Sequence, residues 1–274
     1  MSTPATAGAA VRVQDEPGPD GRAGAIRVVT IDRPHALNAI DVATMQALLS
    51  AFEACAATPG LRAVIVTGAG ERAFVAGADV AELAAMSATD AYAFSRLGHR
   101  VGTAIESLSV PVMAAVNGYA LGGGCELALA CDFVYAASTA RFGLTEGRLG
   151  AIPGFGGTVR LARRVGIARA REMLFTAETV DAAEALRLGL CNRVVEPAAL
   201  MTEARRVAAT ICTRAPLAVA SAKRALRDGA DVPEGQALAV EAELFAALFA
   251  TADLRAGMRA FLDKAAGPPV WQGQ

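Results

Sequence analysis

Runs of β-branched residues alternate with Ala-rich stretches through the first two-thirds of the chain. Short apolar runs bounded by glycine or proline are typical of buried strands, and longer stretches with apolar residues every three or four positions are typical of helices. The predicted strands are 26–31, 61–67, 110–119 and 133–137. The predicted helices are 42–57 with Asp41 as its N-cap, 91–108, one that begins near Cys125, and 159–165. This alternation predicts an α/β fold.

The pattern changes at both ends of this region. Residues 1–24 are rich in Ala, Gly and Pro and predict a flexible leader, which leaves a core at 25–197. Residues 198–274 show only helical patterns, over 199–213, 216–228, 233–251 and 254–265. A helical tail of this kind either packs on a neighbouring subunit or caps its own core, and the pattern leaves both possibilities open.

Composition excludes several classes of partner. The 274 residues carry 26 Lys and Arg against 27 Asp and Glu, a net charge of −1, so we expect no binding to nucleic acid or to an anionic membrane surface. No apolar run reaches the roughly 18 residues of a membrane span. Five cysteines without C-x-x-C spacing predict a reducing, cytoplasmic location and no disulfide framework.

The chain has only two histidines, His35 and His99. A His-rich metal site is therefore excluded, and we expect no metal. Acid–base chemistry, if present, would run on carboxylates.

Two glycine-rich turns could bring backbone N–H groups to a ligand, at 76–79 and 122–126. The second predicts a helix start, where N–H groups lack intrahelical partners and can form an oxyanion hole. Glu126 lies in the first turn of that helix, and Glu146 lies in the next glycine-containing turn, 142–147. Two carboxylates in one site favour one neutral acid and one ionised base. Ordinary strand–helix turns and a favourable charge at a helix start explain the same features taken singly.

Taken in order along the chain, these motifs resemble the enoyl-CoA hydratase/isomerase (crotonase) family over nearly the whole length. The segments that carry the resemblance are 33–39 (RPHALNA), 67–70 (TGAG), 76–79 (AGAD), 115–127 (AVNGYALGGGCEL), 152–154 (IPG), 156–158 (GGT), Ala185 with 189–190, and 261–264.

The resemblance implies a crotonase-like spiral of ββα units that forms two nearly perpendicular sheets, followed by a helical oligomerisation region. It implies a homo-trimer, or a hexamer built as a dimer of trimers. The implied activity is reversible syn hydration of 2-enoyl-CoA to 3-hydroxyacyl-CoA, of the 3-hydroxybutyryl-CoA dehydratase type, with no cofactor beyond the CoA of the substrate. The alternatives are a 3-methylglutaconyl-CoA hydratase and an enoyl-CoA isomerase.

The family's functional residues can be placed on this sequence. Glu126 is implied as the base toward water and Glu146 as the acid toward C2, and isomerising relatives commonly lack one of these acids. The oxyanion hole falls on the backbone N–H groups of Ala78 and Gly123. The implied CoA and substrate contacts are Arg33, His35, Ala36, Leu37, Ala76, Asp79, Val80, Phe261 and Lys264.

Some positions depart from the family pattern. Leu144 and Thr145 stand before Glu146, where many hydratases carry a polar residue and a proline, and His35 stands where a lysine or arginine is common. Arg96, His99 and Arg100 form a basic cluster that is either a solvated helix face or a contact for a distal carboxylate, as in 3-methylglutaconyl-CoA.

A competing class rests on the glycines after the strand at 61–67. Gly68-x-Gly70-x-x-Ala73 matches the dinucleotide fingerprint, which requires a helix to begin at those glycines. Residues 71–75 run instead into another glycine turn, so the sequence disfavours a nicotinamide oxidoreductase.

Overall fold

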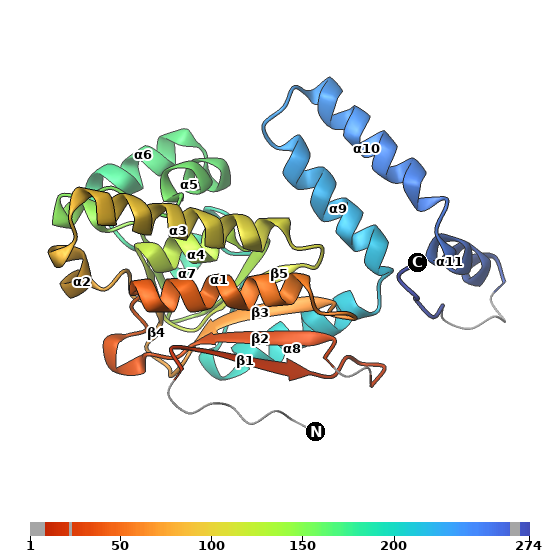
Figure 1. The fold of residues 1–274 in the computed structure, drawn as a ribbon, viewed down its shortest axis with the longest axis horizontal. Coiled ribbons are helices and arrows are strands. Elements are labelled where there is room, and N and C mark those ends of the chain that lie inside the picture. Colours follow the sequence, from red (N-terminus) through yellow and green to blue (C-terminus); the bar gives the residue numbers. More distant parts are fainter. Residues whose placement is uncertain (1–8, 22–23, 264–268) are drawn as a thin grey trace.

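Two sheets organise the protein, in a computed structural model that describes residues 9–21, 24–263 and 269–274. The larger sheet has the order β1-β2-β3-β5-β7-β10, of which β1, β2 and β3 lie side by side in Figure 1, and the smaller one has the order β4-β6-β8-β9. The strands of the larger sheet are β1 (Val11–Glu16), β2 (Ile26–Ile31), β3 (Ala63–Gly68), β5 (Val112–Val116), β7 (Phe133–Ala137) and β10 (Arg193–Val195). Those of the smaller sheet are β4 (Ala73–Val75), β6 (Tyr119–Leu121), β8 (Arg141–Gly143) and β9 (Val180–Asp181).

Consecutive strands enter the two sheets in turn. The chain passes from β3 to β4, from β5 to β6 and from β7 to β8, and each step leaves the larger sheet for the smaller one. In the larger sheet β3, β5 and β7 run parallel, and in the smaller sheet β4, β6 and β8 run parallel. This repetition is the spiral of ββα units, so the predicted fold class is confirmed.

Helices connect and cover these strands. The α-helices of the core are α1 (Val42–Ala56), α2 (Val80–Ala85), α3 (Ala88–Ser107), α4 (Gly123–Ala130), α5 (Gly157–Val165), α6 (Ile167–Thr176) and α7 (Ala182–Arg187). Short 3-10 helices are η1 (Pro34–Ala36), η2 (Glu146–Leu149) and η3 (Pro197–Ala199). The C-terminal helices are α8 (Leu200–Cys212), α9 (Pro216–Gly229), α10 (Glu234–Leu248) and α11 (Ala252–Leu262).

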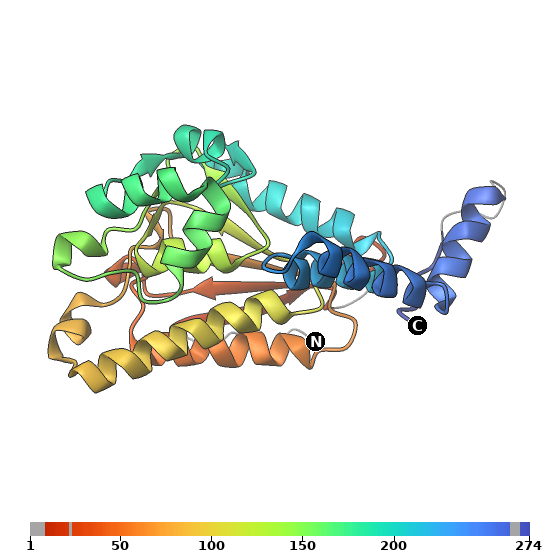
Figure 2. The same cartoon turned by 90° about the horizontal axis from the view of Figure 1, so that it is seen from above.

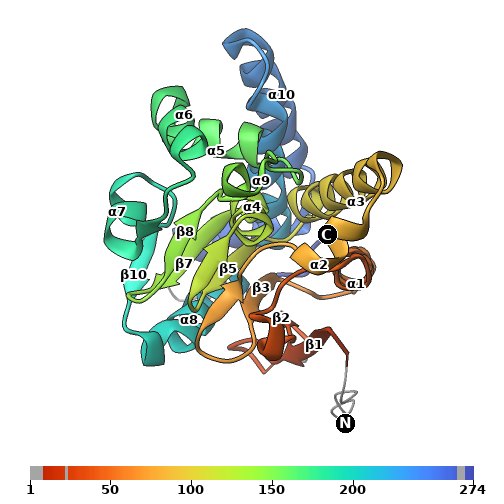
Figure 3. The ribbon, with the colours of Figure 1, turned by 90° about the vertical axis from the view of Figure 1, so that its left-hand side faces the viewer.

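The six-stranded sheet is buried on both faces. Val29, Val64 and Val66 join the main core with α1, α3 and α4. Alternate positions such as Val28 and Ile65 pack with α8, which lies across the sheet from α1 and α3 (Figure 3). Burial on both faces explains why these strands read as continuous apolar runs.

After β10 the described residues form η3 and the helices α8 to α11 and no strand, as predicted, while residues 269–274 have no regular secondary structure. α9 and α10 form an antiparallel pair beside the core, and α10 and α11 extend beyond the sheets (Figures 1 and 2). None of the described helices is both long and apolar enough to cross a membrane.

Three expectations need correction. The leader predicted for 1–24 contains a strand, β1, which pairs antiparallel with β2. Its exposed and partly charged residues do not show the apolar pattern of a buried strand. The strand predicted for 110–119 is two strands in different sheets, because the chain turns at Gly118, where a Cβ would lie 2.2 Å from the Arg72 carbonyl oxygen. The helix expected near Cys125 begins at Gly123. As the sequence indicated, β3 leads into β4 and not into a helix, contrary to the dinucleotide fingerprint.

Candidate active site

Helix α4 carries Glu126 into the interior. A Cβ at Gly124 would lie 2.1 Å from the Val75 carbonyl oxygen, so the helix sits directly on β4. All eight residues of α4 are buried, and Glu126 is only 2% exposed. The glycines that open the helix thus allow a carboxylate to be held inside the core.

The Glu126 carboxylate is oriented by two backbone donors from one turn. The N–H groups of Phe155 and Gly157 each donate to Glu126 Oε1 at 2.7 Å. A Cβ at Gly157 would lie 2.9 Å from that oxygen, so the close approach depends on glycine. With Oε1 fully engaged, Oε2 is left to act on a ligand.

Glu146 approaches the same place from the other side. It is half-buried as the first residue of η2, and its Oε2 is buried without a hydrogen-bond partner among the described residues. A Cβ at Gly122 would lie 2.9 Å from Glu146 Oε1, and Gly122 has a φ of +48°. Since Gly122 is the N-cap of α4, the two carboxylates flank the start of that helix.

The backbone N–H groups of Ala78 and Gly123 lie close together near the start of α4. Ile40 donates to Gly77 O and accepts from the Asp79 N–H, both at 2.9 Å. In a parallel bridge of this kind the N–H of Ala78 points away from Ile40. Gly123 is the first residue of α4, so its N–H has no intrahelical acceptor. A Cβ at Gly123 would lie 3.8 Å from Ala78 N, so the two amides are neighbours.

The electrostatics of the pair suit proton transfer near neutral pH. Burial raises the pKa of Glu126 to about 7, and the charge of Glu146 adds to this effect. The two N–H bonds and Arg160 act in the opposite direction and are outweighed. Burial also raises the pKa of Glu146. One protonated and one ionised carboxyl can therefore face a single ligand.

This constellation can stabilise an oxyanion and move protons on both sides of it. Two converging N–H donors stabilise negative charge that develops on a carbonyl oxygen. An ionised carboxylate accepts a proton from water, and a protonated one donates to carbon.

Comparisons with known proteins show the family to which this chain belongs. The family model described as enoyl-CoA hydratase/isomerase matches residues 21–274. The chain belongs to the enoyl-CoA hydratase/isomerase family. It is 46% identical over 241 residues to a short-chain-enoyl-CoA hydratase of Clostridium acetobutylicum, a match that covers 88% of this chain and 92% of the relative. A crotonyl-CoA hydratase of Syntrophomonas wolfei is 45% identical over 239 residues, with 87% and 92% covered.

The fold likeness is equally close. The crystal structure of an enoyl-CoA hydratase from Bacillus anthracis superposes with a TM-score of 0.91 at 35% identity, covering 97% of this chain and 100% of that one. The resemblance to the enoyl-CoA hydratase/isomerase family that the motifs indicated is thus confirmed.

Most of the CoA contacts predicted from the family lie on two adjacent segments. The Ala76 N–H donates to Leu37 O at 3.1 Å, so residues 33–37 and 76–80 run side by side. The Arg33 guanidinium connects the two segments. It lies 3.3 Å from the Asp79 carboxylate, 3.0 Å from the Asp41 carboxylate and 2.5 Å from Ala39 O. His35 is exposed beside them.

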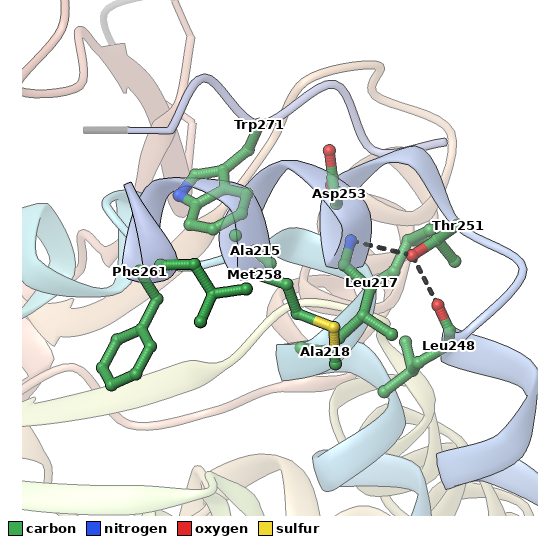
Figure 4. Close-up of a pocket in the computed structure, with 12 residues that line it drawn as sticks. Ala215, Leu217, Ala218, Leu248, Thr251, Asp253, Met258, Phe261 and Trp271 are labelled. Carbon is green, nitrogen blue, oxygen red and sulfur yellow. Dashed lines mark hydrogen bonds between the residues drawn. The ribbon is translucent and has the colours of Figure 1, made fainter. Parts of the chain in front are cut away.

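The other two predicted contacts lie elsewhere. Phe261 is on α11, away from the two glutamates, and its side chain is 84% exposed. It borders an apolar pocket of about 490 Å³ formed by α9, α11 and Trp271 (Figure 4). Lys264 lies outside the described residues.

Two buried or partly buried asparagines were not predicted from the sequence. Asn38, with a φ of +59°, donates to Ala69 O at 3.0 Å and Ala73 O at 2.8 Å. Asn117 donates to Gly70 O at 2.7 Å and accepts from the Gly68 N–H at 3.2 Å. They hold the loops before β4. The sequence signal that could have identified them is a polar residue inside an apolar motif, because a buried polar side chain needs hydrogen-bond partners.

One departure from the family pattern, Leu144, has a structural explanation, and the basic cluster can be placed on α3. Leu144 is fully buried, and a Cβ at Gly157 would lie 3.0 Å from its Cδ1, so it fills space beside Glu126. In the basic cluster, Arg96 and Arg100 are exposed, and Arg100 lies 3.7 Å from Glu53. Burial, Arg96 and Arg160 lower the pKa of His99.

Proposed function

We propose that this protein hydrates short 2-enoyl-CoA thioesters to 3-hydroxyacyl-CoA and catalyses the reverse dehydration, and that crotonyl-CoA is its typical substrate. The observation that carries the proposal is the pair of carboxyls, buried Glu126 and half-buried Glu146, on either side of two adjacent amides. The two relatives, a short-chain-enoyl-CoA hydratase and a crotonyl-CoA hydratase, support a short acyl chain.

Each group has one role in the proposed reaction. The thioester oxygen accepts hydrogen bonds from the Ala78 and Gly123 N–H groups, which stabilise the enolate that forms as water adds to C3. Glu126 removes a proton from the water while the water oxygen forms a bond to C3. The electrons of the C2=C3 bond pass to the enolate, and Glu146 donates a proton to C2. Dehydration exchanges the two roles.

Two narrower alternatives are less well supported. A protein that only moves a double bond does not need to activate water, whereas here a carboxyl lies on each side of the amides. A substrate with a distal carboxylate would need a cation at the acyl end. The small cavity beside Glu126 is lined from α3 by Gly98, Val101 and Gly102, and not by Arg96, His99 or Arg100.

The proposed chemistry uses no cofactor beyond the CoA of the substrate. Arg33 to Leu37 with Ala76 to Val80 would contact the CoA, and Phe261 and Lys264 would reach it from a neighbouring subunit. A cytoplasmic location fits the five cysteines, all of which are buried.

We further propose a homo-trimer or a dimer of trimers. α9 and α10 contain no buried residue. Leu226 on α9, Phe245 on α10 and Phe249 directly after α10 are exposed. Burial of such side chains against another copy would stabilise the helices. Light scattering after size-exclusion chromatography should give the mass of three or six chains. A fully active monomer would contradict this assembly.

The test of function is direct. Purified protein mixed with crotonyl-CoA should consume the enoyl thioester and form 3-hydroxybutyryl-CoA, identified by mass spectrometry. No conversion of any 2-enoyl-CoA between four and eight carbons, in a folded sample, would overturn the proposal.

A further inference from the structure

The space beyond the reacting groups is closed by one aromatic side chain, Phe155. A cavity of about 10 Å³ touches both Glu126 and Gly123 and is bordered by Phe155. This volume holds about one water-sized group. Its remaining wall is apolar and includes Met45 and Val101. An alkyl group attached to C3 would therefore meet a short, dry space.

The Phe155 ring lies in a slot made by two glycines. A Cβ at Gly98 on α3 would lie 2.2 Å from Phe155 Cδ1, and a Cβ at Gly123 would lie 2.8 Å from Cε2. Phe94 contacts the ring edge-on, with ring centroids 5.0 Å apart. A larger residue at either glycine would displace the ring, so the slot defines its position.

The backbone of Phe155 is equally constrained. Its N–H donates to Glu126 at 2.7 Å, and its carbonyl accepts from Arg160 at 2.8 Å. Arg160 is itself paired with Glu106 at 2.6 Å. The Ser95 hydroxyl on α3 donates to the Gly154 carbonyl at 2.5 Å. Because the same residue orients Glu126, the ring forms a fixed wall of the site.

We propose that Phe155 sets the acyl-chain length that this protein accepts. With its ring held between Gly98 and Gly123, the pocket accepts one carbon beyond C3, the methyl group of a crotonyl chain. Longer chains meet the ring. This inference rests on the proposed function, since it takes the reacting carbons to lie between Glu126 and Glu146.

The test compares kcat/KM for 2-butenoyl-, 2-hexenoyl- and 2-octenoyl-CoA in the wild type, Phe155→Ala and Phe155→Leu. Each methylene is worth about 10- to 200-fold in a fitted pocket. We expect Phe155→Ala to raise the hexenoyl-to-butenoyl ratio by about tenfold or more, with Phe155→Leu between it and the wild type. Phe175→Ala, at an exposed ring on α6, is the matched control and should leave the ratio unchanged.

The outcomes separate the two proposals. If the wild type hydrates none of these esters, the proposed function fails. If it hydrates 2-butenoyl-CoA and Phe155→Ala leaves the ratio at the wild-type value, only the role of Phe155 fails.

A second measurement covers the case in which Phe155→Ala is inactive. Gly98→Ala should lower the melting temperature in the wild-type background and have little effect in Phe155→Ala, because the added methyl then meets no ring. An equal decrease in melting temperature in both backgrounds would contradict the placement of the Phe155 ring against Gly98.

Discussion

The two regions that carry the glutamates hold chemically identical side chains in different ways. Glu126 lies on a fully buried helix, and one of its oxygens accepts two N–H bonds from the turn before α5. Glu146 begins a four-residue 3-10 helix, is half-buried, and presents an oxygen with no partner among the described residues. One carboxylate is therefore oriented by two hydrogen bonds, and the other lies beside Gly122, where the lack of a Cβ leaves room for it. This difference fits two separate tasks in one reaction.

The largest expected effect comes from removing either carboxyl. Glu126→Gln and Glu146→Gln should each lower kcat/KM for crotonyl-CoA hydration by about 10³-fold, because acid–base groups typically contribute about 10²–10⁴. Glutamine keeps the shape of the side chain, and in Glu126→Gln the new amide oxygen can still accept the two N–H bonds. Binding of a saturated acyl-CoA, measured by calorimetry, should change little. Near-wild-type turnover in either variant would remove that residue from the mechanism.

The position of Glu146 can be disturbed without changing its chemistry. Gly122→Ala places a methyl 2.9 Å from Glu146 Oε1 at a φ of +48°. Since displacement of a catalytic group by about 1 Å can cost about 10²-fold, we expect a decrease in kcat of that size. Steady-state kinetics with crotonyl-CoA would measure it.

Gly166→Ala is the matched control for this variant. Gly166 also has a positive φ, +80°, but no atom lies within 4 Å of an added Cβ. It should carry the same kind of backbone strain and leave kcat unchanged. An equal loss of kcat in both variants would mean that strain alone explains the effect.

A smaller effect should appear in the pH profile. Burial and the charge of Glu146 raise the pKa of Glu126 to about 7, so below that pH the base becomes protonated. kcat/KM for hydration should therefore fall about tenfold per pH unit below 7.

The melting temperature should be measured over the same pH range, to show that the protein stays folded. A profile that is flat down to pH 5 would contradict the role of Glu126 as base.

The sequence predicted the elements that carry a strong local signal. The apolar runs at 26–31 and 133–137 match β2 and β7, and Asp41 caps α1 through the Thr44 N–H at 2.7 Å. It missed β1, whose exposed charged residues become a strand only by pairing with β2. It joined β5 and β6, because the apolar run continues across the turn at Gly118.

The site was predicted in part. Glycine turns and nearby glutamates indicated which groups could act, and the family resemblance assigned their roles. The two N–H donors to Glu126 come from residues about thirty positions later, and Arg33 is held by Asp79 from 46 positions away. Such contacts depend on the tertiary fold, and no local pattern encodes them.

Hydrogen exchange at C2 of the acyl group tests most directly whether Glu126 and Glu146 have separate roles. A saturated ester such as butyryl-CoA has no water to add or lose, so under the proposed mechanism exchange of its C2 proton with D₂O should require only Glu146 and the two amides. In NMR measurements, Glu126→Gln should exchange the proton at close to the wild-type rate, and Glu146→Gln should lose exchange. Exchange that survives in Glu146→Gln and disappears in Glu126→Gln would contradict the assignment of the two carboxyls.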